Sequence, residues 1–199
     1  MTHPLILASA SAVRARLLQN TGLAFETISA DLDEDAVKLQ SQRDGRDIKE
    51  TALRLAREKA KAVSVYHSDA LVIGADQMLE QDGRWFDKPS NRAEARAHLK
   101  TFSAHAHQLV TAAVAIEGGT VVWERVDTAT LTVRALSDDF IDAYLDQIGN
   151  DAYLSVGAYQ LEGRGAQLFD AIEGDFFTIL GLPLLPLLGF LRQRAISGT

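Results

Sequence analysis

The chain has 199 residues, a formal net charge of −7 at pH 7 and no cysteine. This length supports one sizeable hydrophobic core, so we expect a single domain over residues 1–199. The acidic balance argues against a broad nucleic-acid-binding surface, and the lack of cysteine excludes a disulfide framework or a thiolate metal site. The sequence has no signal-peptide pattern and no apolar run long enough for a membrane span, so we expect a cytoplasmic protein.

The N-terminal segment combines a buried strand with the start of a helix. The apolar run 5–8 predicts the strand, and Ser11 is a good N-cap for a helix that runs up to a C′ residue at Gly22. The first-turn N–H groups and the helix dipole favour an anion there, with Ser9, Ser11 and Arg14 as further donors. Taken alone, the serines are also explained by capping.

The next segments alternate strand and helix. We expect a strand over 25–30, then a polar, acidic loop over 31–47. A capping-box pattern begins a helix that runs from Asp47 to about Val65. The apolar run 70–75 predicts a buried strand that ends at Asp76. A carboxylate at that position would project from the carboxyl edge of the sheet, where ligands bind in open α/β folds.

The rest of the chain is predicted mainly from turn and capping signals. The expected elements are a hairpin turn at Asp82-Gly83, a helix over 91–102, strands over 108–117 and 120–134 joined by Gly118-Gly119, a helix from Ser137 to Gly149, a strand or extended segment over 153–161, a strand over 166–172, and a closing helix from about Pro183. Early alternation followed by hairpins predicts an α/β fold with a mixed twisted sheet and flanking helices.

Several polar side chains are candidates for chemistry. Asp76 can accept a proton from water or bind a divalent cation, although a turn aspartate is the plain alternative. Glu34, in the acidic cluster 33–35, is the preferred partner of Asp76 for such a cation, but any of the three acids could be the ligand. His105 and His107 share one face of a strand, and no third ligand clusters with them, so we interpret His107 as structural.

Five short segments of the sequence, in this order, carry a family resemblance. They are Ser9-x-Ser11-x-x-Arg14, Glu58-Lys59-Ala60, Ile73-Gly74-Ala75-Asp76-Gln77, Lys88-Pro89 with Glu94-Ala95, and Gly174-Asp175 with Gly181-Leu182-Pro183. They resemble the motifs of the Maf family of nucleotide pyrophosphatases and span nearly the whole chain. One tripeptide alone is weak evidence, but five in register make coincidence a poor explanation.

The resemblance implies an elongated, two-lobed fold with a central cleft, similar to inosine triphosphate pyrophosphatases. It implies a nucleoside triphosphate pyrophosphatase with Asp76 as proton acceptor. We expect this enzyme to use Mg²⁺ or Mn²⁺, with Asp76 and Glu34 as the metal ligands. Lys59, which would otherwise be interpreted as a solvated helix lysine, and Lys88 then bind phosphates together with Arg14. A homodimer is the hypothesis for the oligomeric state.

Substrate choice depends on departures from the family pattern. Val13 and Glu162 stand where the dTTP/UTP branch tends to have a basic residue and a glutamine. A carboxylate at 162 accepts hydrogen bonds from a guanine edge and repels the oxygen acceptors of uracil or thymine, which favours a 7-methyl-GTP-type substrate. The alternatives are a dTTP/UTP pyrophosphatase, a phosphatase that releases single phosphates, and a nucleotide-binding regulator of cell division without relevant turnover.

Overall fold

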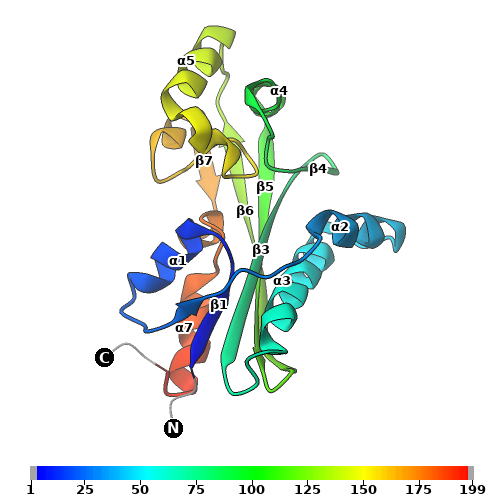
Figure 1. The fold of residues 1–199 in the computed structure, drawn as a ribbon. Coiled ribbons are helices and arrows are strands. Elements are labelled where there is room, and N and C mark those ends of the chain that lie inside the picture. The colour runs from blue at the N-terminus through cyan, green and yellow to red at the C-terminus, as the bar shows by residue number, and fades with distance from the viewer. Residues whose placement is uncertain (1–3, 197–199) are drawn as a thin grey trace. The chain divides into compact units, whose positions relative to one another are not determined.

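The structure is a computed structural model that describes residues 4–196, and its strands form one mixed sheet (Figure 1). The strands are β1 (Leu5–Ala8), β2 (Glu26–Thr27), β3 (Leu71–Gln81), β4 (Arg84–Phe86), β5 (Ala106–Glu117), β6 (Thr120–Val133) and β7 (Phe169–Glu173). Their order is β2-β1-β3-β5-β6-β7, and β4 pairs with β3. β1 is parallel to β2 and β3, whereas β4 and β7 pair antiparallel with β3 and β6. The expected mixed α/β architecture is confirmed.

The helices connect these strands. They are α1 (Ala12–Gln19), α2 (Glu34–Arg43), α3 (Ile48–Ser64), α4 (Arg92–Phe102), α5 (Asp138–Ile148), α6 (Phe176–Ile179) and α7 (Leu184–Gln193), with 3-10 turns η1 (Gly149–Tyr153) and η2 (Arg164–Leu168). The predicted caps Ser11, Asp47 and Ser137 each accept a backbone N–H of the helix that follows. No helix within residues 4–196 is both long and apolar enough to cross a membrane.

The chain divides into two compact units, each built from separate segments. The first unit contains Met1–Gln77, Thr111–Asp127 and Phe176–Thr199, and the second contains Met78–Val110 and Thr128–Asp175. The expected single domain over 1–199 stays a prediction, and its residues 1–3 and 197–199 lie outside the described part.

In the first unit, helices cover both faces of the sheet. On one face, α1 and α7 pack on β1, β3 and β5 through a cluster that includes Leu7, Leu18, Ile73, Ala113 and Leu187. Burying each large side chain of this cluster stabilises the fold by about 1.5–3 kcal/mol. α3 covers the other face, where a Cβ on Gly74 would lie 2.2 Å from the carbonyl oxygen of Ala56. Gly74 therefore allows a close approach of α3 to β3.

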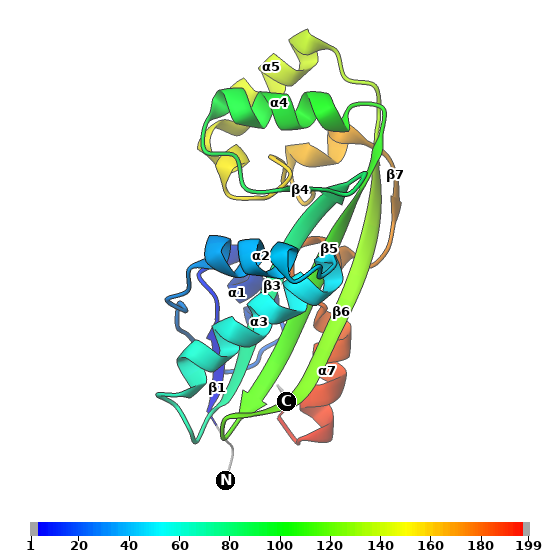
Figure 2. The same ribbon diagram turned by 90° about the vertical axis from the view of Figure 1, so that its right-hand side faces the viewer.

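Several expectations about the fold are wrong. The predicted acidic loop 31–47 contains α2, which Asp33 caps by accepting the N–H of Ala36 at 2.9 Å. α2 lies beside α3 in both views (Figures 1 and 2), and this tertiary contact stabilises a helix with few apolar residues. The segment 153–161 forms turns instead of a strand, and only two of the residues 25–30 belong to β2.

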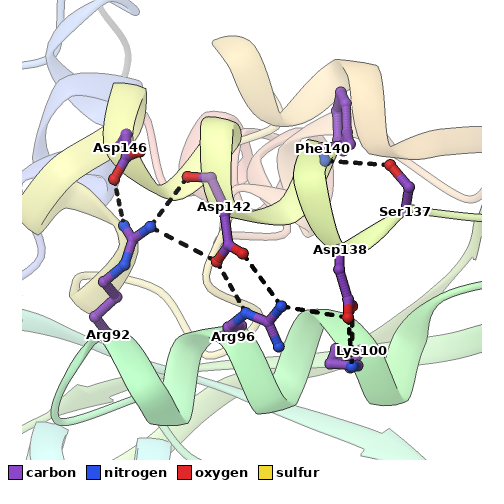
Figure 3. Close-up of polar contacts among 8 residues, drawn as sticks. All are labelled: Arg92, Arg96, Lys100, Ser137, Asp138, Phe140, Asp142 and Asp146. Carbon is purple, nitrogen blue, oxygen red and sulfur yellow. Dashed lines mark hydrogen bonds and ion pairs between the residues drawn. The ribbon is translucent and has the colours of Figure 1, made fainter.

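In the second unit, α4 and α5 are held together by a ladder of ion pairs (Figure 3). Arg92 contacts Asp142 and Asp146, Arg96 contacts Asp138 and Asp142, and Lys100 contacts Asp138. The three cations and the three carboxylates each recur every fourth residue, so the two antiparallel helices present complementary rows. The ladder fixes the helices in register at the surface of this unit.

Candidate functional site

Asp76 lies inside strand β3, two residues beyond the end of its pairing with β1. The last paired residues are Ala8 and Gly74, and the polypeptide of β1 leaves the sheet there. The expectation that the strand ends at Asp76 is wrong, because β3 continues to Gln81 and forms a hairpin with β4. Alternate residues share a face of a strand, so Asp76 faces α3 as Gly74 does. Its side chain is buried.

Lys59 and Glu34 meet Asp76 in the first unit. Nζ of Lys59 lies 2.6 Å from Oδ1 of Asp76 and 2.8 Å from Oε1 of Glu34. Lys59 is itself buried, because it lies on the helical stripe that Ala56 and Ala60 also occupy. The interpretation as a solvated surface lysine is therefore wrong. Glu34 is placed by the first turn of α2, one residue after the N-cap.

Arg14 connects α1 to two other parts of the first unit. Its Nε donates to the carbonyl oxygen of Gly181 at 2.6 Å, and Nη1 donates to the carbonyl oxygen of Ala75 at 3.0 Å and to Oγ of Ser9 at 3.3 Å. Nη2 has no hydrogen-bond partner among residues 4–196. Arg14 thus orients the backbone beside Asp76 through Nε and Nη1.

We expect Ser9 and Ser11 to bind phosphate, but both hydroxyl groups make their hydrogen bonds at the start of α1. Oγ of Ser9 accepts the N–H of Ser11 at 3.2 Å, and Oγ of Ser11 accepts the N–H of Arg14 at 3.3 Å. The capping interpretation of Ser11 is confirmed. Phosphate binding at this helix start stays a prediction, supported by the positive charge of Arg14 beside it.

The environment of Asp76 favours its use as a base. Burial raises the pKa of the Asp76 carboxyl, and the charges of Lys59 and Arg14 act in the opposite direction. A carboxylate with a raised pKa takes a proton from water more readily than an exposed aspartate does. Burial also lowers the pKa of Arg14, and the charges of Asp76 and Glu34 oppose that shift.

Gln77 is a site residue to which the sequence assigned no role. Its Nε2 lies 2.9 Å from Oγ1 of Thr111 and 3.0 Å from the carbonyl oxygens of Thr178 and Ile179. These contacts join β3 to β5 and to α6, directly after Asp76. In the sequence, the only indication of a role for Gln77 was its place in the Ile73–Gln77 segment.

Lys88 and Glu162 belong to the second unit, so their relation to Asp76 stays a prediction. Lys88 is exposed and stands before the start of α4, where Glu94 accepts both the N–H and the hydroxyl of Ser90. Glu162 is exposed in a tight turn in which the carbonyl oxygen of Gln160 accepts the N–H groups of Gly163 and Gly165.

His107 has the structural environment that the sequence suggested. Its Nε2 lies 2.6 Å from the hydroxyl oxygen of Tyr159, and the imidazole packs against Phe102 and Phe169. Burial lowers the pKa of His107 to about 4, so the ring is neutral near pH 7. This contact anchors the segment that leads to Glu162.

For a divalent cation, the first unit offers two carboxylates. No group of three or more histidine, cysteine, aspartate or glutamate side chains within residues 4–196 is arranged to hold a metal. Mg²⁺ usually takes one or two protein carboxylates, and substrate phosphates and water complete its shell. Asp76 and Glu34, whose oxygens already share one cationic nitrogen, fit that donor set.

The fold and this site define a mixed α/β protein with a buried carboxylate that is paired with a lysine and lies within the electrostatic influence of an arginine. A family model described as Maf-like protein matches residues 4–194, and the chain belongs to the Maf family. A "7-methyl-GTP pyrophosphatase" of Rhizobium meliloti is 52% identical over 95% of each chain. A "Nucleoside triphosphate pyrophosphatase" of Granulibacter bethesdensis is 50% identical over 96% of each chain, and one of Paramagnetospirillum magneticum is 52% identical over 95% of this chain and 97% of its own.

Proposed function

We propose that this protein hydrolyses nucleoside triphosphates to a nucleoside monophosphate and pyrophosphate. The observation that carries the proposal is the buried Asp76 carboxylate, paired with Lys59 and backed by the charge of Arg14. Full-length relatives with about half of their residues identical bear the name of that activity, which supports the same conclusion.

The proposed reaction is attack of water on the α-phosphorus. Asp76 accepts a proton from the water, the bond between the α-phosphorus and the oxygen that bridges to the β-phosphate breaks, and pyrophosphate leaves with the bonding electrons. The charges of Arg14, Lys59 and Lys88 offset the negative charge on the phosphoryl oxygens. Arg14 contributes its Nη2 group, because its other nitrogens bond to the protein.

Metal dependence is part of the proposal. Glu34 and Asp76 would hold Mg²⁺ or Mn²⁺, which when bound polarises phosphate oxygens as a Lewis acid. The convergence of both carboxylates on a single cationic nitrogen supports this assignment. Treatment with a chelator should abolish turnover, and added Mg²⁺ or Mn²⁺ should restore it.

For the nucleobase of the substrate, we propose a 7-methyl-GTP-type preference. The carboxylate of Glu162 suits the donor edge of guanine, and two relatives named for 7-methyl-GTP are 52% and 49% identical to this chain. The alternative is a preference for dTTP and UTP. We also propose a cytoplasmic location, supported by the cysteine-free sequence. The homodimer stays a prediction, and light scattering would measure the molecular mass that tests it.

A panel of canonical and modified triphosphates tests the activity. The pure protein is incubated with each nucleotide and Mg²⁺ or Mn²⁺, and the nucleotide product and the released phosphate species are identified. We expect monophosphate with pyrophosphate. Diphosphate with orthophosphate would instead support the phosphatase hypothesis, and no turnover with retained binding would support the regulator.

A further inference from the structure

Two carboxylates of the first unit share one cation, and that cation is a side chain of the protein itself. Nζ of Lys59 lies 2.6 Å from Asp76 Oδ1 and 2.8 Å from Glu34 Oε1. Both distances are typical of charge-assisted hydrogen bonds. The ammonium therefore bridges these two carboxylate oxygens.

The burial of this group makes the ammonium important to Asp76. The side chains of Asp76 and Lys59 are only 6% and 11% exposed, whereas that of Glu34 is 44% exposed. A buried carboxylate without a countercharge is strongly disfavoured. Lys59 thus stabilises the ionised form of Asp76 and brings the more exposed carboxylate of Glu34 close to it.

We propose that Lys59 and the divalent cation exchange at this position. Binding of the metal by Glu34 and Asp76 displaces Nζ from both carboxylates, and the released ammonium pairs with a substrate phosphate. The inference rests on the metal dependence proposed above and adds a step in which one cation replaces another. Two cations that share the same oxygens repel each other, so the metal and the ammonium compete. The flexible four-carbon stem of lysine permits the movement.

The exchange links metal binding to nucleotide binding. Without a nucleotide, the metal has to displace Lys59 from its two partners, so the metal binds weakly. A triphosphate offers the displaced ammonium another anion, so the nucleotide strengthens metal binding and the metal strengthens nucleotide binding equally. Lys59 then pairs first with the two carboxylates and, after the exchange, with a phosphate.

Removing the ammonium tests the competition directly. We would titrate Mn²⁺ into nucleotide-free wild-type protein and Lys59→Met, and measure free Mn²⁺ by electron paramagnetic resonance. The exchange predicts at least about tenfold tighter binding by Lys59→Met. Lys61→Met, on the exposed side of the same helix, is the matched control and should bind as wild type does. Adding Glu34→Gln to Lys59→Met should remove the gain.

Equal or weaker Mn²⁺ binding by Lys59→Met, or none by either protein, would overturn the exchange. A second measurement uses wild-type protein and does not depend on the stability of the variant. With lysine labelled by ¹³C at Cε, Mg²⁺ without nucleotide should shift the Lys59 resonance and leave that of Lys61 in place. An unmoved Lys59 resonance in Mg²⁺-saturated protein would overturn the proposal. Metal-independent turnover would contradict the proposed function instead, so the two failures are distinguishable.

Discussion

Nε of Arg14 donates a hydrogen bond of 2.6 Å to the carbonyl oxygen of Gly181, which is 167 residues away in the sequence. The same guanidinium holds the carbonyl oxygen of Ala75, directly before the proposed base. Gly181 has a φ of +95°, and a Cβ there would lie 3.2 Å from Arg14 Nε. Gly181 thus contributes to the site through its contact with Arg14.

Gly181→Ala should lower both stability and turnover. The backbone conformation alone costs about 1–2 kcal/mol for a residue with a Cβ, and the added methyl group also displaces Arg14. Thermal denaturation and steady-state kinetics measure the two effects. Gly22→Ala is the matched control, because its φ is +78° and no atom lies within 4 Å of the added Cβ. It should lose stability but keep kcat, and equal kinetic losses in both variants would contradict the role of Arg14.

Asp76→Asn should lower kcat by a factor on the order of 10² to 10⁴, because the isosteric amide cannot accept a proton and binds a cation poorly. The circular dichroism spectrum should stay that of wild type. Asp82→Asn, in the exposed turn between β3 and β4, is the control and should leave kcat unchanged. Turnover of Asp76→Asn within about threefold of wild type would remove Asp76 from the role of base.

His107 should make the fold less stable in acid. Its pKa is about 4 in the folded protein and about 6.5 when unfolded, so between these values the unfolded chain binds a proton that the folded one does not. Stability is therefore lost as pH falls from about 6.5 to 4, by up to roughly 3 kcal/mol. The free energy of unfolding, measured by urea denaturation at pH 7 and pH 4.5, should fall less in His107→Gln than in wild type. The same fall in both would contradict the prediction, and His105→Gln, at an exposed imidazole, is the control.

Glu162→Gln should change the preference among bases. Replacing an acceptor oxygen with an NH₂ donor should cost guanine-type substrates about 1–3 kcal/mol of discrimination and relieve repulsion against uracil and thymine. kcat/KM for 7-methyl-GTP, GTP, UTP and dTTP measures the shift. Asp170→Asn, an exposed carboxylate on β7, is the control. A uniform change across the four substrates would mean that Glu162 does not recognise the base.

Local signals predicted the elements that depend on local physics. The apolar run of β1, the capping box at the start of α3 and the Gly118-Gly119 hairpin are all found where the sequence placed them. α2 was missed because its residues are mostly polar and its contact with α3 is not visible in the sequence. The turns over 153–161 were missed because Tyr159 is fixed by His107, which lies 52 residues earlier.

The site shows the same division between local and tertiary information. Apart from the family resemblance, the sequence indicated a solvated Lys59. The structure places Lys59 on the buried stripe of Ala56 and Ala60 and brings it to Asp76 and Glu34. The rows of charge on α4 and α5 were regular in the sequence, yet their pairing depends on the antiparallel packing of these helices (Figure 3). The extension of β3 beyond Asp76 depends on its hairpin with β4.

The position of water attack tests the central claim most directly. A substrate triphosphate is hydrolysed in H₂¹⁸O with the required metal, and the products are examined by ³¹P nuclear magnetic resonance, in which ¹⁸O shifts the signal of the phosphorus that carries it. If Asp76 activates water for attack on the α-phosphorus, one ¹⁸O enters the nucleoside monophosphate and none enters the pyrophosphate. Label in pyrophosphate or in orthophosphate would contradict the account.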